Sequence, residues 1–181
     1  MKSNDTIASR RIFLIGYMGS GKTTRGRALA GLLNLPFVDL DEWVAGSTRR
    51  SLVDWFTHSG EEAFRMAESD ALREWCDSGA YGVMATGGGT PMHHDNMKLM
   101  QESGTTVYLQ VHEQELVRRL AADNASRPLL SGLDGRELDS FVRAHLHSRE
   151  SRYLESHRIW REEESPEDFA KQLSLHSTSA H

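Results

Sequence analysis

The chain has 181 residues, a net charge of −5 and 38% hydrophobic residues, which suits one globular domain over 1–181. Its longest basic runs are arginine pairs, so neither a nucleic-acid binder nor a membrane-surface binder is favoured. The single cysteine, Cys76, excludes an intrachain disulfide, and no apolar stretch could span a bilayer. We therefore expect a soluble, cytoplasmic protein with Cys76 in a packing role and disordered ends at about 1–9 and 175–181.

Short apolar runs alternate with helical patterns along the chain. Five runs have the length and the β-branched or aromatic content of buried strands: 12–15, 37–40, 81–85, 105–111 and 158–160. Helical patterns follow them at 23–33, 61–77, 92–102, 113–122, 136–155 and 166–173. Capping boxes at Ser59 and Ser165 mark two helix starts, and a third at Ser51 opens a short helix. Such alternation predicts an α/β fold whose parallel sheet is covered on both faces.

The first predicted strand leads into residues 16–23, which read GYMGSGKT and match the phosphate-loop pattern G-x-x-x-x-G-K-[ST] in full. Glycines let backbone N–H groups curl around an anion, and the following helix start adds unpaired donors and partial positive charge. Lys22 is expected to reach the β- and γ-phosphates, and the Thr23 hydroxyl is expected to hold Mg²⁺. The chain is thus predicted to bind a nucleoside triphosphate. The expected nucleotide-binding residues of this loop are Gly19, Ser20, Gly21, Lys22, Thr23 and Thr24.

Carboxylates and glycines follow the next two predicted strands. Asp39 and Asp41 come at the end of the second strand, where open α/β sheets place their ligands. One carboxylate near the Mg²⁺ shell and another near a hydroxyl acceptor would suit phosphoryl transfer. The run 87–89, all glycine, follows the third strand and would let a ligand approach main-chain N–H groups. For Asp39 and Asp41 the alternative is a polar turn, and for the glycine run it is a plain flexible turn.

Several arginines are candidates for binding a carboxylate or a phosphate, because guanidinium binds both bidentately and keeps its charge. Arg65 and Glu68 are three residues apart on one predicted helix face. Arg149 and Arg152 have the same spacing and are expected to project together. By spacing alone, a surface ion pair explains each of these arginines equally well.

Another candidate, Arg127, lies in the stretch 123–135, which contains a proline and two glycines and shows no clear period. This stretch is predicted to be a long mobile loop. The nine histidines show no metal-ligand spacing, so all are interpreted as surface residues and no zinc site is assigned.

Together these motifs resemble one family, the shikimate kinases, over about residues 11–155. Beyond the phosphate loop and Asp39-Leu40-Asp41, the similarity rests on segments that occur in the family's order: 51–56, 60–68, 87–89, 127–130 and 148–153. The resemblance implies a three-layer P-loop fold like that of nucleoside-monophosphate kinases. It also implies a five-stranded parallel sheet in the order 2-3-1-4-5, a lid at about 123–135 and a substrate-binding region.

The implied reaction is transfer of the ATP γ-phosphoryl group to the 3-hydroxyl of shikimate, which yields 3-phosphoshikimate and ADP for chorismate and aromatic amino acid biosynthesis. Asp39 would lie in the water shell of Mg²⁺, and Asp41 would orient or deprotonate the attacking hydroxyl. Arg119 would stack near adenine, although Arg118 beside it leaves that register open. The resemblance implies catalytic roles for Lys22, Asp41 and for Arg127, which would also bind the nucleotide. The implied substrate-binding residues are Asp41, Arg65, Gly87, Gly88, Gly89, Arg149, Phe56 and Phe64.

The chain departs from the family pattern at Trp55, where a smaller aliphatic residue is usual, and at Thr90, where a small apolar residue is common. Two alternatives stay open: a related gluconate or nucleotide kinase, and a non-catalytic nucleotide-binding module. The joint presence of the Asp-x-Asp, Phe-Arg-x-x-Glu and glycine motifs argues against the first. The second would predict loss of the reactive residues, which are present. The predicted partners are ATP and shikimate, without nucleic acid or membrane, and the chain is predicted to be a monomer.

Overall fold

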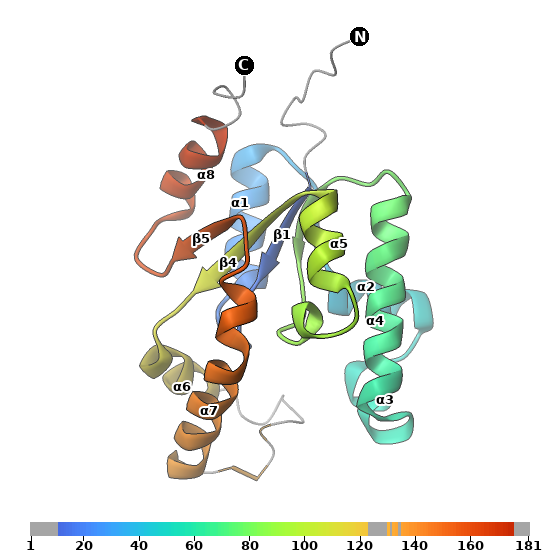
Figure 1. Cartoon of the computed structure of the whole chain (residues 1–181), viewed down its shortest axis with the longest axis vertical. Coiled ribbons are helices and arrows are strands. Elements are labelled where there is room, and N and C mark those ends of the chain that lie inside the picture. The colour runs from blue at the N-terminus through green and yellow to red at the C-terminus, as the bar shows by residue number, and fades with distance from the viewer. Residues whose placement is uncertain (1–10, 123–129, 131, 134, 176–181) are drawn as a thin grey trace.

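The computed structural model describes residues 11–122, 130, 132–133 and 135–175, with Leu52 and Leu175 described by their backbone only. Within this part of the chain, five strands form one sheet (Figure 1), in the order β2-β3-β1-β4-β5. All four neighbouring pairs are parallel, as predicted, and the order of the strands is the one that the resemblance implied. The strands are β1 (Arg11–Ile15), β2 (Phe37–Asp39), β3 (Gly82–Ala85), β4 (Thr105–Gln110) and β5 (Arg158–Arg161).

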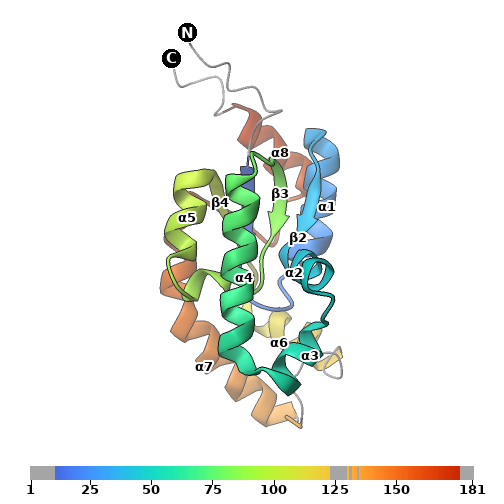
Figure 2. The ribbon, with the colours of Figure 1, turned by 90° about the vertical axis from the view of Figure 1, so that its right-hand side faces the viewer.

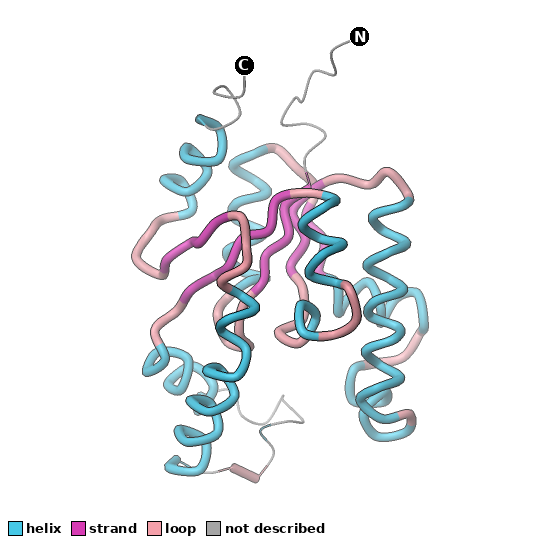
Figure 3. Tube along the Cα trace, in the orientation of Figure 1, coloured by secondary structure: helices cyan, strands magenta, loops and turns pink. Residues whose placement is uncertain are grey.

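Helices cover both faces of this sheet, and Figures 2 and 3 show the strands enclosed between them. The described helices are α1 (Lys22–Leu33), α2 (Leu40–Thr48), α3 (Leu52–His58), α4 (Gly60–Asp77), η2 (Thr90–Met92), α5 (Asn96–Ser103), α6 (Glu113–Ala122), α7 (Gly135–Tyr153) and α8 (Pro166–Leu175). Helices α1 and α8 pack on one face, and α4, α5 and α7 pack on the other. The predicted three-layer α/β architecture is therefore confirmed.

The alternation of side chains along β1 explains why its sequence is apolar throughout. Ile12 and Leu14 pack in the cluster with α1 and α8, whereas Phe13 and Ile15 pack in the larger cluster on the opposite face. All four side chains are almost fully buried. A central parallel strand is buried on both faces, so it needs apolar residues at every position. Cys76 belongs to the larger cluster, as its predicted packing role requires.

The helix α2 is absent from the elements predicted by sequence, since no helix was assigned to the segment after β2. The Asp39 side chain caps this helix by accepting a hydrogen bond from the Asp41 backbone N–H at 3.1 Å. An aspartate at the N-cap stabilises a helix start, so the same carboxylate that marks a ligand site also begins α2. Its apolar residues Leu40 and Val44 are buried one turn apart.

Two of the predicted helix caps form, and one does not. Ser51 makes the full reciprocal capping box with Asp54 at the start of α3. At α8 the Ser165 hydroxyl accepts from the Asp168 backbone N–H and donates to the Asp168 carboxylate. The box predicted at Ser59 is wrong, since its side chain makes no cap bond and instead accepts from Arg50. The preceding helix α3 ends at the same serine, which puts its backbone in a geometry unsuited to a box.

Some predictions fall on residues outside the described part of the chain. These include the disordered ends, although α8 continues to Leu175, and most of the predicted lid, including Arg127. Of the lid segment, Leu130 is described as a buried residue that packs in the larger core cluster. No helix among the described residues has the length and apolar character that crossing a membrane requires.

Candidate active site

The carboxyl ends of β1, β2 and β3 meet at a cleft with a volume of about 510 Å³. The sheet order places β3 between β1 and β2, so the segments after these three strands converge although they are far apart in sequence. The cleft is lined by Met18, Gly19, Gly21, Lys22, Thr23, Thr24, Asp39, Asp41, Thr86, Gly87, Gly88 and Arg119. Residues from the phosphate loop, the Asp-x-Asp and the glycine run thus share one cavity.

The phosphate loop has the backbone geometry that its glycines allow. Gly19 and Gly21 have φ angles of 78° and 88°, in the region that L-residues with a Cβ rarely adopt. No side chain caps the start of α1, so its first N–H groups face the cleft without that partner. The Lys22 ammonium donates to the carbonyl oxygens of Gly16 and Tyr17, at 2.8 Å and 2.9 Å. The loop therefore combines an uncapped helix N-terminus with a cation.

Thr23 and Asp39 lie together at the edge of this loop. The Thr23 hydroxyl donates to Asp39 Oδ2 at 2.7 Å, while Asp39 Oδ1 caps α2. A hydroxyl and a carboxylate are hard oxygen donors, the class that Mg²⁺ prefers. Within the described residues, no group of three or more His, Cys, Asp or Glu side chains could hold a metal. A magnesium ion here would need further oxygen ligands from phosphates and water, which is its usual mode of binding to proteins.

Asp41 is partly buried in the first turn of α2 and lines the cleft. Burial raises the pKa of its carboxyl from the ordinary 3.8 to about 6, and the charges of Glu68 and Asp39 act in the same direction. The cations Lys22 and Arg65 oppose this rise. A carboxyl poised near neutral pH can accept a proton from a reacting hydroxyl, which is the behaviour expected of a general base.

Arg65 is buried, with 5% of its surface exposed, and lies between two carboxylates of α4. Its Nη1 donates to Glu68 at 3.0 Å, and its Nε and Nη2 donate to Glu61 at 3.3 Å and 3.1 Å. Guanidinium has five N–H donors, so among the described residues one N–H on each Nη atom has no recorded partner. These two N–H groups are donors that a ligand carboxylate could use.

The glycine run packs directly against this arginine and its partner. A Cβ on Gly89 would lie 2.7 Å from Arg65 Cζ, and one on Gly87 would lie 2.5 Å from Glu68 Oε1. Both distances are too short for real carbon atoms, so neither position tolerates a side chain without rearrangement. The run was predicted to admit a ligand close to the backbone. In the structure, it also admits the side chains of α4.

On helix α7, Arg149 and Arg152 do not project together, contrary to the prediction from their spacing. Arg149 Nη1 lies 3.4 Å from the carbonyl oxygen of Gly88, which also accepts from the Tyr153 hydroxyl at 2.6 Å. Arg152 is 42% exposed in its side chain and pairs with Glu155. A spacing of three residues is about 60° short of a full helical turn, so packing against the sheet decides which side chain faces the site.

Phe56 and Phe64 form an aromatic cluster next to Arg65. Their ring centroids are 5.6 Å apart, and the Arg65 guanidinium carbon lies 5.3 Å from the Phe64 ring centroid. Phe64 is buried in the core, and Trp55 packs against it edge to face. These residues are absent from the lining of the cleft, as are Arg65 and Arg149. The two arginines adjoin the cleft through the glycine run instead.

The structure distinguishes Arg119 from Arg118, a choice that the sequence left open. Arg119 Nη1 is 3.3 Å from the carbonyl oxygen of Gly19, whereas Arg118 pairs with Glu115 at the surface. Arg119 is also held by Glu115 at 2.7 Å and by Glu162 at 2.6 Å. These bonds lie in the guanidinium plane, so what Arg119 can offer a ligand is mainly a face for stacking.

One contact of the phosphate loop was missed by sequence reasoning. The Tyr17 hydroxyl lies 2.9 Å from His145 Nδ1 on α7. Burial, followed by the charge of Arg149, lowers the pKa of His145 to about 4, so the imidazole is neutral at pH 7. The interpretation of every histidine as a surface residue is therefore wrong for His145. Nothing in its sequence neighbourhood signals the contact, because the partner is 128 residues away.

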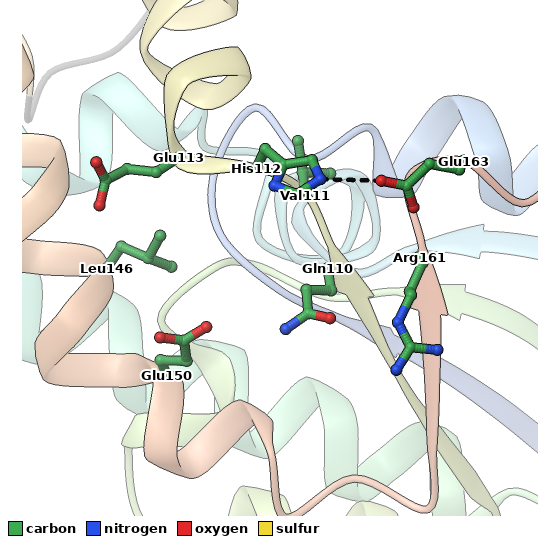
Figure 4. A pocket seen from close by; sticks show the side chains of 8 residues that line it. All are labelled: Gln110, Val111, His112, Glu113, Leu146, Glu150, Arg161 and Glu163. Carbon is green, nitrogen blue, oxygen red and sulfur yellow. Dashed lines mark hydrogen bonds and ion pairs between the residues drawn. The ribbon is translucent and has the colours of Figure 1, made fainter.

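A second hollow, of about 300 Å³, opens at the carboxyl ends of β4 and β5 and shares no lining residue with the cleft (Figure 4). Its lining consists of Gln110, Val111, His112, Glu113, Leu146, Glu150, Arg161 and Glu163. His112 and Glu163 bond to each other at 2.9 Å, and Figure 4 shows the carboxylates of Glu113 and Glu150 on either side of Leu146. Because carboxylates outnumber cations here, this hollow suits phosphate groups less well than the cleft.

Comparisons with known proteins agree on one family. The family model described as shikimate kinase matches residues 18–176. The shikimate kinase of Parabacteroides distasonis is 43% identical over 147 residues, which cover 81% of this chain and 84% of that protein. The crystal structure of shikimate kinase from Bacteroides thetaiotaomicron is 38% identical, has a TM-score of 0.83, and is matched over 92% of this chain and 97% of that chain. The Acinetobacter baumannii shikimate kinase in complex with shikimate is 31% identical, with a TM-score of 0.81, over 95% of this chain and 96% of that chain.

Proposed function

The chain belongs to the shikimate kinase family, and we propose that its cleft binds ATP and shikimate together and transfers the γ-phosphoryl group to the 3-hydroxyl of shikimate. The products are 3-phosphoshikimate and ADP, on the route to chorismate and the aromatic amino acids. The observation that carries this proposal is that three features converge on the glycine run 87–89. They are the phosphate loop, Asp41 and the ion pair between Arg65 and Glu68. A phosphate site, a hydroxyl acceptor and a carboxylate clamp thus adjoin one another.

The phosphate groups of ATP would bind at the loop and at the start of α1. Backbone N–H groups of 19–24 would donate to them, and Lys22 would exchange two neutral carbonyl acceptors for charged phosphate oxygens, which bind an ammonium more strongly. Arg119 would stack on the adenine ring through a guanidinium face. Its in-plane bonds to Glu115 and Glu162 support that role, because they fix the orientation of the plane.

Magnesium fits the residues beside the loop, where a hydroxyl and a carboxylate are already 2.7 Å apart. Thr23 would bind the ion directly, and Asp39 would hold it through a water molecule. When bound, Mg²⁺ neutralises negative charge that develops on the phosphate oxygens during transfer. Asp39 would then keep its second oxygen on the α2 cap, so the ion and the first turn of α2 share one anchor.

The substrate side of the site would be built from Asp41, Arg65 and Arg149. Ionised Asp41 would accept a hydrogen bond from the attacking hydroxyl, orient it, and take its proton as transfer proceeds. The remaining edge of the Arg65 guanidinium would bind the shikimate carboxylate bidentately, with Arg149 adding a second cation. The position of both arginines along the glycine run supports this assignment. Phe56 and Phe64 would support Arg65 from behind through their aromatic cluster.

Several predictions concern features on which the described residues give no information. Closure of the segment 123–135 over the site, with Arg127 reaching the transferring phosphoryl group, stays a prediction because most of that segment, including Arg127, lies outside the described residues. Such closure would exclude water and so limit ATP hydrolysis. The monomeric state and the cytoplasmic location likewise stay predictions from the sequence.

A substrate panel tests the proposed reaction directly. ADP release is measured by a coupled assay with ATP and Mg²⁺ against shikimate, gluconate and nucleoside monophosphates, with the Lys22→Ala protein as a control for contaminating kinases. We expect turnover with shikimate alone. Turnover only with gluconate or a nucleotide would identify a related kinase. Nucleotide binding without turnover of any acceptor would identify a non-catalytic module.

A further inference from the structure

A buried polar network connects the end of the glycine run to Arg65. Glu68 of α4 is fully buried, with 0% exposure, and both of its carboxylate oxygens have a donor. Oε2 accepts from Arg65 Nη1 at 3.0 Å, and Oε1 accepts from the Thr90 hydroxyl at 2.5 Å. Thr90 is also fully buried and is the residue that directly follows Gly89.

The backbone of Thr90 is held in place from two sides. Its N–H donates to the carbonyl oxygen of Gly87 at 3.2 Å, which closes the turn of the glycine run. Its carbonyl oxygen accepts from the Asn96 side-chain amide at 3.0 Å, and the same amide contacts Ser69 Oγ at 2.9 Å. The backbone position of Thr90 is therefore fixed, and its hydroxyl donates its one hydrogen bond to Glu68.

This hydroxyl matters because the Glu68 side chain is buried away from solvent and closely packed. A buried carboxylate is tolerated only when its oxygens are hydrogen-bonded, and loss of one donor leaves a costly unpaired acceptor. Glu68 Oε1 already lies against Gly87, at 2.5 Å from where a Cβ would stand. A Glu68 carboxylate without its Thr90 donor could restore its bonding only by turning toward Arg65. The N–H of Arg65 Nη1 that is left for a ligand would then be drawn to Glu68.

We propose that Thr90 is a positioning residue for the substrate carboxylate, since its hydroxyl fixes Glu68 and thereby keeps one edge of the Arg65 guanidinium directed at the substrate. This inference rests on the proposed function, because it assumes that Arg65 binds the carboxylate of shikimate. Thr90 does not line the cleft, so its effect should appear in substrate binding and not in the chemical step.

The first test removes the hydroxyl and keeps the shape. Thr90→Val should raise the KM for shikimate by about tenfold, the scale of one hydrogen bond to a charged group, with kcat and the KM for ATP changed by less than about twofold. Thr106→Val is the matched control. Thr106 is also fully buried, and its hydroxyl lies 3.1 Å from His157 Nδ1. It lies at the start of β4, at the opposite end of the sheet from the cleft. That variant should leave both KM values unchanged, whatever it does to stability.

A second pair of variants keeps the test decisive if valine prevents folding. Thr90→Ser and Thr90→Ala both lose the methyl group and differ only in the hydroxyl. Serine should keep a KM for shikimate within about twofold of wild type, whereas alanine should show the tenfold rise. The methyl ester of shikimate, which lacks the anionic carboxylate, should bind wild type and Thr90→Ala equally weakly in a competition assay. In an Arg65→Lys background, Thr90→Ala should have no further effect on the KM for shikimate.

Distinct outcomes separate the failure of this inference from the failure of the proposed function. Absence of shikimate turnover in the wild-type protein would overturn both. Wild-type turnover with an unchanged KM for shikimate in Thr90→Ala would overturn the positioning role alone. Equal KM values for the serine and alanine variants would show that the methyl group matters and not the hydroxyl. An equal loss of affinity for the acid and its ester would show that Thr90 does not act through the carboxylate clamp.

Discussion

Replacing Asp41 with asparagine should stabilise the folded protein while it removes most of the activity. Burial, then the charges of Glu68 and Asp39, raise the pKa of Asp41 from 3.8 to about 6. Since one pKa unit corresponds to about 1.4 kcal/mol, the ionised carboxylate destabilises the folded state by about 3 kcal/mol at pH 8. Asparagine has almost the same shape without the charge, but its amide must also be desolvated. We therefore expect a net gain in unfolding free energy of about 1–2 kcal/mol.

The sign of this effect sets its pH dependence. A carboxyl group whose pKa is raised in the folded state binds its proton more tightly there, so its penalty is absent well below pH 3.8 and complete above about pH 6. At pH 4.5 the penalty from Asp41 is about a third of its full value. The stability difference between Asp41→Asn and wild type should therefore widen from pH 4.5 to pH 8. Wild-type kcat/KM should fall as pH decreases through about 6, because the base becomes protonated.

Urea unfolding followed by circular dichroism at both pH values measures the stability change, and steady-state kinetics at pH 8 measures the activity change. Asp54→Asn is the control with the opposite sign, because hydrogen bonds from Ser51 lower the pKa of that exposed carboxyl, so its removal should destabilise the protein at pH 8. Activity of Asp41→Asn should drop about 10²-fold or more. The reasoning that burial of ionised Asp41 destabilises the fold would be refuted by either of two results. One is an Asp41→Asn variant less stable than wild type at pH 8, and the other is a gain in unfolding free energy that is the same at both pH values. Wild-type activity in the variant would refute its role toward the hydroxyl.

Three further variants test separate parts of the site. Lys22→Ala should lower kcat/KM by about 10²-fold, because it removes a cation from the phosphates, with an unchanged circular dichroism spectrum as the check on folding. Arg65→Lys should raise the KM for shikimate about tenfold and lower the thermal midpoint, since one ammonium cannot replace the bonds to two carboxylates and a ligand; an unchanged KM would make Arg65 purely structural. Glu162→Gln should raise the KM for ATP several-fold and leave that for shikimate unchanged, because it loosens the plane of Arg119; equal changes in both KM values would contradict a nucleotide role.

The phosphate loop and the parallel sheet were predictable because their signals are local or topological, whereas the order of the strands was implied by the resemblance to the family. Glycines at 19 and 21 have positive φ angles, a backbone requirement that can be anticipated from the motif alone. Apolar runs of strand length, separated by helical patterns, restrict the chain to a parallel sheet with crossover helices. The same local logic identified the Ser51 cap, which depends on residues three positions apart. It failed at α2, because Asp39 can cap a helix or end a turn, and neighbouring residues do not decide between the two.

The direction and environment of side chains depended on contacts across the fold. Spacing along α7 could not show that Arg149 faces Gly88 while Arg152 faces solvent, since the packing of the helix against the sheet sets its rotation. The pKa of Asp41 near 6 arises from burial and from Glu68, a residue on another helix. The bond from Thr90 to Glu68 likewise joins positions 22 residues apart. Sequence patterns report the periodicity and chemistry of neighbouring residues, whereas burial, electrostatic coupling and hydrogen-bond partners arise only when distant segments are packed together.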